Sequence, residues 1–155
     1  MKIIGVIPAR YKSSRFPGKP LALINAKPMI IHVAEKVEEA LGKENTYVAT
    51  DDAKIAQIVT SFGYKAIMTS NLCKTGTDRL WDFAQKIQAD IYVNIQGDEP
   101  MVSPLDIKKV VEEKKKNSKY IINGMLPLSK EENPDDVNIP KVLVNKNNML
   151  IYMSR

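Results

Sequence analysis

The sequence predicts an α/β protein with a Rossmann-like, mostly parallel sheet, helices on both faces of that sheet and antiparallel strands toward the C-terminal end. Two observations support this fold class. Through residue 117, apolar runs of strand length alternate four times with segments of helical periodicity, a pattern typical of the βα units of a parallel sheet. Beyond that point, two apolar runs flank the polar turn 145–148, as in an antiparallel hairpin.

Each expected element rests on a local pattern of apolar spacing and of terminating residues. The parallel strands are expected at 2–7, 46–50, 64–68 and 90–96, and the helices at 28–41, 52–62, 77–87 and from Pro104 onward. Gly42 and Gly63 are expected to end the first two helices, whereas Asp51 and Ser103 are expected to cap the second and the fourth. The later apolar runs are interpreted as strands at 120–129, 141–146 and 149–155.

Length and composition are those of one globular domain. The 155 residues suffice for a core, and 44% of them are hydrophobic while 26% are charged. No window approaches 18 consecutive apolar residues, so neither a membrane-spanning helix nor a membrane partner is expected. Cys73 is the one cysteine, which excludes an intramolecular disulfide and favours a cytoplasmic location.

The net charge of +5 raises the question of an anionic partner. Six lysines crowd into the segment 108–119, which is interpreted as the solvated face of a helix that also carries Glu112 and Glu113. Nucleic-acid binding is the weakest of the functions considered, because this stretch lacks interleaved aromatic side chains that could stack on bases. No nucleic-acid partner is therefore expected.

The alternation of strands and helices indicates where functional residues should lie. In parallel βα units every strand ends at the same edge of the sheet, and ligands bind there. The loops at that edge begin at Pro8, Asp51, Thr69 and Gly97.

The first of these loops is strongly basic. The segment IPARYKSSRFPGKPL, residues 7–21, contains Arg10, Lys12, Arg15 and Lys19 and no acidic residue. A triphosphate would supply the matching charge, and each charge-assisted contact to it would contribute roughly 1.5–3 kcal/mol. Neither the P-loop motif nor the dinucleotide-binding motif is present. Composition alone therefore leaves two readings open, an anion-binding loop and a disordered basic loop.

An acidic residue follows the fourth expected strand. Asp98 lies just past the end of 90–96, so it should face the same edge as the basic loop. Mg²⁺ prefers one or two carboxylates together with phosphate oxygens and water, which suits an aspartate beside a triphosphate. The alternative reading is a plain turn, because Gly97, Asp98 and Pro100 are all turn-forming residues.

Five segments together closely resemble the 3-deoxy-manno-octulosonate cytidylyltransferases. They are, in order, IPARYKSSRFPGKPL (7–21), KPMI (27–30), VATDD (48–52), TGTDRL (75–80) and VNIQGDEP (93–100). The resemblance runs from residue 3 to Arg155. The acylneuraminate cytidylyltransferases rank second, because their first loop usually lacks the ending seen here. The resemblance implies transfer of CMP from CTP to the anomeric hydroxyl of 3-deoxy-manno-octulosonate (Kdo), with release of pyrophosphate, for lipopolysaccharide synthesis.

The resemblance also implies which residues carry out the catalysis. Arg10, Lys19 and Asp98 are expected to be catalytic, with Arg10 and Lys19 holding the triphosphate and Arg15 assisting from the same loop. Asp98 is expected to bind Mg²⁺, the implied cofactor, and Gln96 to approach the sugar.

Recognition of the nucleotide base is assigned by resemblance to two further places. The backbone at Ala9 and the loop after the third strand are expected to contact the cytosine. By position, that loop contributes Thr69, Gly76 and Arg79.

The resemblance further implies that members of this family continue beyond this chain. We therefore expect residues 1–155 to form a single nucleotidyltransferase-like domain that is incomplete at its C-terminus, and the full-length protein to be a homodimer. The missing part would supply a second metal ligand and most of the sugar contacts. Three functions stay open: the Kdo enzyme, a cytidylyltransferase for another acidic sugar, and a CTP-binding fragment without turnover.

Overall fold

The structure is a computed structural model, and it describes residues 1–12 and 16–154. Its contacts divide the chain into two compact units, Met1–Ile122 and Asn123–Arg155, which are described one at a time. The sequence-based expectation of a single domain stays a prediction.

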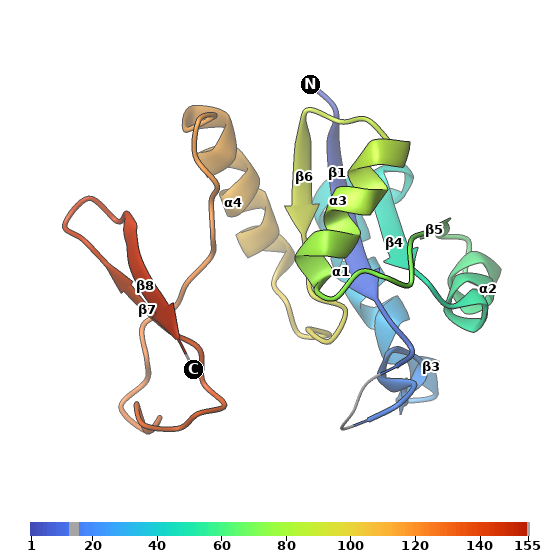
Figure 1. Ribbon diagram of the computed structural model, residues 1–155, viewed down its shortest axis with the longest axis horizontal. Coiled ribbons are helices and arrows are strands. Elements are labelled where there is room, and N and C mark those ends of the chain that lie inside the picture. The colour runs from blue at the N-terminus through green and yellow to red at the C-terminus, as the bar shows by residue number, and fades with distance from the viewer. Residues whose placement is uncertain (13–15, 155) are drawn as a thin grey trace. The chain divides into compact units, whose positions relative to one another are not determined.

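The first unit is built on a parallel sheet, as the sequence predicts. The sheet contains β1 (Ile3–Ala9), β4 (Thr46–Thr50), β5 (Lys65–Met68) and β6 (Ile91–Asn94) in the order β5-β4-β1-β6 (Figure 1). All three neighbouring pairs are parallel. A short antiparallel pair, β2 (Leu23–Ile24) and β3 (Lys27–Pro28), lies between β1 and the first helix in the chain.

Helices cover both faces of this sheet, which confirms the predicted fold class. They are α1 (Met29–Leu41), α2 (Ala53–Ser61), α3 (Gly76–Lys86) and α4 (Pro104–Lys116). The 3-10 turn η1 (Lys19–Leu21) precedes α1 in the chain, and the 3-10 turn η2 (Lys43–Asn45) follows it. Because side chains alternate along a strand, Ile7 of β1 packs with α1, α2 and α4, whereas Ile4 and Val6 pack with Phe83 of α3. Figure 1 shows α3 on the near face of the sheet, with α1 behind it. The burial of β1 on both faces explains its continuous apolar sequence.

One predicted cap is wrong. Asp52, and not Asp51, caps α2, because the Asp52 carboxylate accepts hydrogen bonds from the backbone N–H groups of Lys54 and Ile55 at 2.9 and 3.1 Å. The Asp51 side chain is thereby free for another contact, which belongs to the candidate site. The predicted cap of α4 is confirmed, since Ser103 accepts a hydrogen bond from the backbone of Asp106.

The second unit contains the predicted hairpin but not the predicted strand before it. β7 (Lys141–Val144) and β8 (Leu150–Ser154) pair antiparallel across the expected turn. Residues 120–129, expected as a strand, have no regular structure. Pro127 cannot donate a ladder hydrogen bond, Gly124 weakens strand structure, and apolar content alone does not form a strand without a partner.

Membrane crossing was not expected from the sequence. None of the helices within residues 1–12 and 16–154 combines the length and apolar character that a bilayer span requires.

Candidate functional site

The basic loop and the predicted metal ligand meet at the carboxyl edge of the sheet. The Lys19 ammonium lies 2.7 Å from Asp98 Oδ2, although the two residues are 79 positions apart. Both side chains remain accessible, with exposed fractions of 41% and 50%. Lys19 opens η1 after Gly18, whose φ of 72° suits glycine and whose backbone N–H donates to the carbonyl of Tyr11 at 2.8 Å. Gly18 is thus held against Tyr11, and the Lys19 side chain that follows is directed at Asp98.

Close backbone packing brings two further loops to the same edge. A Cβ atom on Gly97 would lie 2.8 Å from the carbonyl oxygen of Pro8. A Cβ atom on Gly76 would lie 3.3 Å from the ring of Pro8 and 3.5 Å from Oε1 of Gln96. The end of β1, the start of α3 and the loop after β6 therefore converge around Pro8, and Gln96 faces the first turn of α3.

The other residues of the first loop that were predicted to bind the nucleotide are Arg10, Ala9 and Arg15. Arg10 is exposed, and its Nη1 donates to the carbonyl of Lys74 at 3.4 Å, in the loop that leads into α3. Ala9 ends β1 with only 5% of its surface exposed, so its backbone and not its side chain is the group placed at the edge. Arg15 lies outside the described residues.

Two of the residues assigned to base recognition, Thr69 and Arg79, are buried and contact each other. Arg79 is 2% exposed, and its Nη1 donates to the Thr69 hydroxyl at 2.5 Å. Its Nη2 lies 3.2 Å from Oδ2 of Asp51. Asp51 is therefore a member of the site region that sequence reasoning missed. The available signal was the pair Asp51-Asp52, because only one of two adjacent carboxylates can cap the same helix.

The loop after β5 is attached to α3 at further points. The Asp82 carboxylate accepts the backbone N–H of Ser70 at 2.8 Å, and the Lys86 ammonium donates to the Met68 carbonyl at 2.8 Å. The hydrogen bond from Ser70, and then the one from Lys86, hold the pKa of Asp82 below its usual value. These hydrogen bonds hold the loop after β5 against one face of α3.

The first turn of α3 is closed by a capping box. Thr75 accepts the backbone N–H of Asp78, and the Asp78 carboxylate accepts the backbone N–H of Thr75 at 2.8 Å. The N–H group of Thr75 is also the main reason why the pKa of Asp78 is lowered.

The donor set for a metal at this edge is small. Among the described residues no three His, Cys, Asp or Glu side chains gather as a metal cluster. Asp98 fits the way in which Mg²⁺ binds beside phosphates, because it is one accessible carboxylate next to Lys19, the predicted phosphate ligand. Metal binding by Asp98 stays a prediction.

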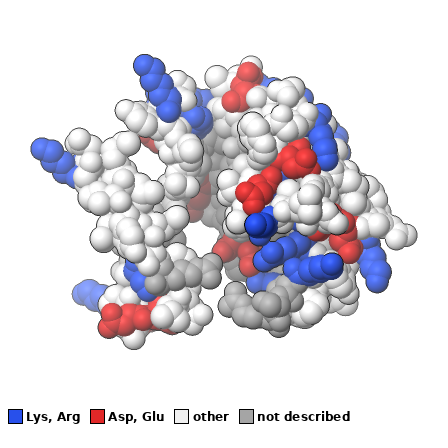
Figure 2. All heavy atoms as spheres, in the orientation of Figure 1, with Lys and Arg blue, Asp and Glu red and all other residues white. Residues whose placement is uncertain are grey.

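Part of the positive charge elsewhere is paired on the protein itself. On α4, Lys109 pairs with Asp106 at 2.9 Å and Lys115 with Glu112 at 2.6 Å. Figure 2 shows basic and acidic side chains interspersed over the visible face, without a continuous basic stripe. This distribution agrees with the interpretation of the lysine-rich helix as a solvated surface.

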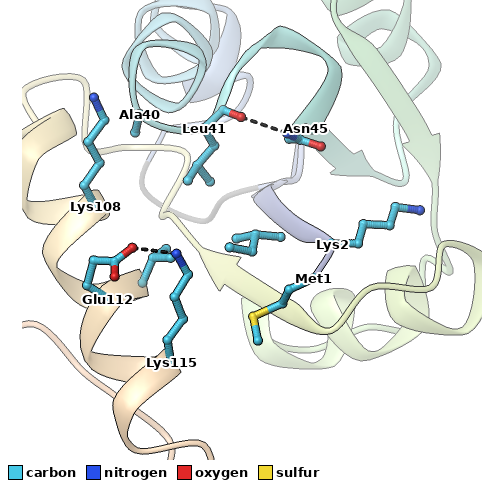
Figure 3. A pocket seen from close by; sticks show the side chains of 10 residues that line it. Met1, Lys2, Ala40, Leu41, Asn45, Lys108, Glu112 and Lys115 are labelled. Carbon is cyan, nitrogen blue, oxygen red and sulfur yellow. Dashed lines mark hydrogen bonds and ion pairs between the residues drawn. The ribbon is translucent and has the colours of Figure 1, made fainter.

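A pocket of about 510 Å³ lies at the opposite edge of the sheet. Met1, Lys2 and Ile3 line it at the amino end of β1, together with residues of α1 and α4 (Figure 3). The close-up shows the Lys115–Glu112 ion pair in its wall. Because Lys19 and Asp98 lie beyond the carboxyl ends of the strands, this pocket is separate from the candidate site.

Comparison with known proteins connects this arrangement to a family. The chain matches the family model described as "Cytidylyltransferase" over residues 4–155. It is 42% identical over 154 residues to a 3-deoxy-manno-octulosonate cytidylyltransferase of Escherichia coli, covering 99% of this chain and 63% of the relative. It is also 42% identical over 161 residues to an 8-amino-3,8-dideoxy-manno-octulosonate cytidylyltransferase of Shewanella baltica, covering 100% of this chain and 65% of the relative.

A solved structure is similar over the same length. A CMP:2-keto-3-deoxy-manno-octonic acid synthetase complexed with CTP superposes with a TM-score of 0.87 at 42% identity, covering 99% of this chain and 64% of that one. The chain thus spans less than two thirds of the length of these relatives.

Proposed function

Because the chain belongs to the cytidylyltransferase family, we propose that it transfers CMP from CTP to the anomeric hydroxyl of Kdo and releases pyrophosphate. The product would be the activated sugar used in lipopolysaccharide synthesis. The observation that carries the proposal is the 2.7 Å approach of Lys19 to Asp98, because it brings the predicted phosphate ligand and the predicted metal ligand together at one edge of the sheet. The relatives named for this reaction support the choice of substrates.

In the proposed reaction the anomeric hydroxyl of the sugar gives up its proton to solvent and its oxygen attacks the α-phosphorus of CTP. The bond from that phosphorus to the oxygen that bridges to the β-phosphate breaks, and this oxygen leaves with the pyrophosphate. Negative charge then grows on the non-bridging oxygens and on the departing pyrophosphate, and fixed cations stabilise it. Lys19 would exchange its contact with Asp98 for a contact with the triphosphate, while Arg10, and Arg15 from the same loop, would add further donors. Mg²⁺, held by Asp98, would supply additional neutralisation of the phosphate charge when bound.

No covalent nucleophile is needed for this chemistry. His32 has a structural contact instead, because its Nε2 lies 2.9 Å from the carbonyl of Ile24 in the short β2–β3 pair. The protein residues would act by binding and orienting CTP. Gln96 would approach the sugar, and the Ala9 backbone with the loop after β5 would contact the cytosine.

The 8-amino sugar is a second candidate acceptor. The Shewanella baltica relative named for that sugar has the same 42% identity as the Escherichia coli relative named for Kdo. Either acceptor would react through its anomeric hydroxyl, so the residues described above would serve both reactions.

Pyrophosphate release tests the proposal directly. The protein is incubated with CTP, Mg²⁺ and either Kdo or its 8-amino analogue, and pyrophosphate is measured over time. We expect release that requires both CTP and one of the sugars. CTP binding without release, with both sugars supplied, would indicate a nucleotide-binding fragment, and absence of CTP binding would overturn the proposal.

A homodimer and a cytoplasmic location belong to the same proposal. The β7–β8 hairpin supports association, because Leu143, Ile151 and Tyr152 are at least 60% exposed. Light scattering during size-exclusion chromatography would measure the mass in solution, and a monomer at all concentrations would contradict the dimer. The use of CTP, an intracellular nucleotide, supports the location.

A further inference from the structure

We propose that Asp51 is a positioning residue: by holding Arg79 it fixes the loop after β5, and it thereby sets the preference of the site for cytosine. This inference rests on the proposed function, since it concerns how the same site distinguishes one base from another. Asp51 would act through Arg79 and would not touch the nucleotide.

The first step is the burial of the ion pair. The Arg79 side chain is 3% exposed and that of Asp51 is 19% exposed, with Nη2 and Oδ2 separated by 3.2 Å. A guanidinium so far from water needs a charged or strongly hydrogen-bonding partner, because its desolvation is otherwise uncompensated. Asp51 supplies that partner, so the ion pair fixes the position of the Arg79 side chain.

The second step is the connection to the base-recognition loop. The other terminal nitrogen of Arg79 donates to the hydroxyl of Thr69, and the Thr69 backbone N–H donates to the carbonyl of Thr50 at 2.8 Å. The end of β4, the end of β5 and the first turns of α3 are therefore joined by one guanidinium. With 2% of Arg79 exposed, its guanidinium joins these three segments, and its assignment to base recognition stays a prediction.

The third step is that one face of α3 contacts the loop after β5. Arg79, Asp82 and Lys86 are spaced three and four residues apart, which puts them on one side of the helix. All three contact residues 68–70. The backbone groups of this loop are thus preorganised, and reading a base by hydrogen bonds depends on such fixed donors and acceptors.

The fourth step is the separation from the triphosphate ligands. Lys19 belongs to the loop after β1 and pairs with Asp98, which follows β6. The contact between the basic loop and the base-recognition loop, from Arg10 to Lys74, is long at 3.4 Å. Loss of Asp51 should therefore weaken contacts to the base far more than contacts to the phosphates.

The test compares Asp51→Asn with Asp52→Asn, its matched neighbour. Titration calorimetry in Mg²⁺ measures the Kd of CTP, of UTP and of inorganic tripolyphosphate. For Asp51→Asn we expect the Kd of CTP to rise about tenfold, because misplacement of fixed groups is costly. The CTP-over-UTP preference should fall, while the Kd of tripolyphosphate should change less than about twofold. Asp52→Asn removes charge at the cap of α2 and should leave the preference unchanged.

The outcomes separate this inference from the proposed function. Wild-type protein that binds neither CTP nor tripolyphosphate would overturn both. Wild-type protein that prefers CTP, together with an Asp51→Asn variant of unchanged preference, would overturn the positioning role alone. An equal loss of CTP and tripolyphosphate binding would do the same, since Asp51 would then affect the phosphate contacts as much as the base contacts.

A second pair of variants protects against misfolding and tests whether Asp51 acts through Arg79. Thr69→Val removes the other acceptor of Arg79 at nearly constant shape, and it should lower the CTP-over-UTP preference without loss of tripolyphosphate binding. Addition of Asp51→Asn to Arg79→Met should cause no further loss of preference. A further loss in that double variant would show that Asp51 acts independently, which would overturn the inference.

Discussion

Lys19 is the single residue on which we expect triphosphate binding to depend most. Its ammonium is half-exposed and lies at the edge where the strands end, ready to exchange Asp98 for phosphate. Replacement by alanine removes one charge-assisted contact worth roughly 1.5–3 kcal/mol, so the Kd of CTP should rise about 10- to 100-fold. Titration calorimetry measures this change.

Lys109→Ala is the matched control for that experiment. Lys109 also forms an exposed ion pair, with Asp106 on α4, and its loss changes the net charge equally. We expect CTP affinity close to that of the wild type. Comparable weakening by the two variants would mean that general charge, and not the basic loop, governs binding.

Asp98→Asn should have opposite effects with and without metal. With Mg²⁺ present, loss of the carboxylate should weaken CTP binding and abolish most of its metal dependence. In EDTA the variant should bind CTP equally well or up to about fivefold more tightly, because an exposed ion pair of roughly 0.2–1 kcal/mol no longer competes for Lys19. Calorimetry in both buffers measures the contrast, and an unchanged response to Mg²⁺ would remove Asp98 as the metal ligand.

Sequence reasoning located these two residues but not the role of Asp51. Lys19 and Asp98 stand out because each follows a strand and carries a charge that matches the expected ligand. Asp51 and Asp52 are chemically identical neighbours, and the choice between capping and ion pairing depends on where α3 places Arg79. That position is a property of the tertiary structure and not of the local sequence.

Among the elements, α3 should be the one most sensitive to acid. The pKa values of Asp78 and Asp82 are lowered, first by the N–H groups of Thr75 and Ser70. A carboxyl with a lowered pKa stabilises the fold above its ordinary value, about 4, and this stabilisation is lost as the pH falls through the folded-state pKa. Stability should therefore decline below about pH 4.

Urea unfolding followed through Trp81 measures this decline, because Trp81 lies on α3 and is the only tryptophan in the sequence. Asp82→Asn should be less stable than the wild type at pH 7 and should lose less stability between pH 7 and pH 3. Parallel pH profiles for the two proteins would contradict the assignment.

The junction of β6 with the end of β1 makes a steric prediction. A Cβ atom on Gly97 would meet the carbonyl oxygen of Pro8 at 2.8 Å, and a backbone atom cannot rotate away. Gly97→Ala should therefore lower the free energy of unfolding by about 1–3 kcal/mol and weaken CTP binding. Gly76→Ala is the control for stability, since its Cβ would lie 3.3 Å from a ring carbon of Pro8, and we expect a much smaller effect on the free energy of unfolding. Equal urea midpoints for the two variants would refute the steric argument.

The sequence predicted a helix or strand well where the spacing of its own apolar residues decides whether it forms. The strand 46–50 was predicted with its observed bounds, and α3 was predicted one residue late because Thr75 begins its capping box before the apolar periodicity starts. Residues 120–129 were predicted wrongly because strand formation needs a neighbouring strand, which apolar content does not reveal.

At the scale of the whole molecule, the two units differ in how much core they contain. The first has side chains that are fully buried on both faces of β1, whereas no described residue of 123–154 is buried. An isolated two-stranded hairpin is marginally stable in water. The amides of β7 and β8 should therefore exchange with solvent far faster than those of β1 and β4, although all four strands have ladder hydrogen bonds.

Hydrogen exchange followed by mass spectrometry tests this contrast. Peptides from β1 and β4 should stay protected for hours, because their exchange requires unfolding of the first unit. Peptides from 123–154 should exchange within seconds to minutes at low protein concentration. If the proposed dimer covers the hairpin, protection of β7 and β8 should rise with protein concentration while that of β4 stays constant, since association stabilises only the segments that it buries. Strong protection of β8 that does not depend on concentration would contradict a marginal hairpin.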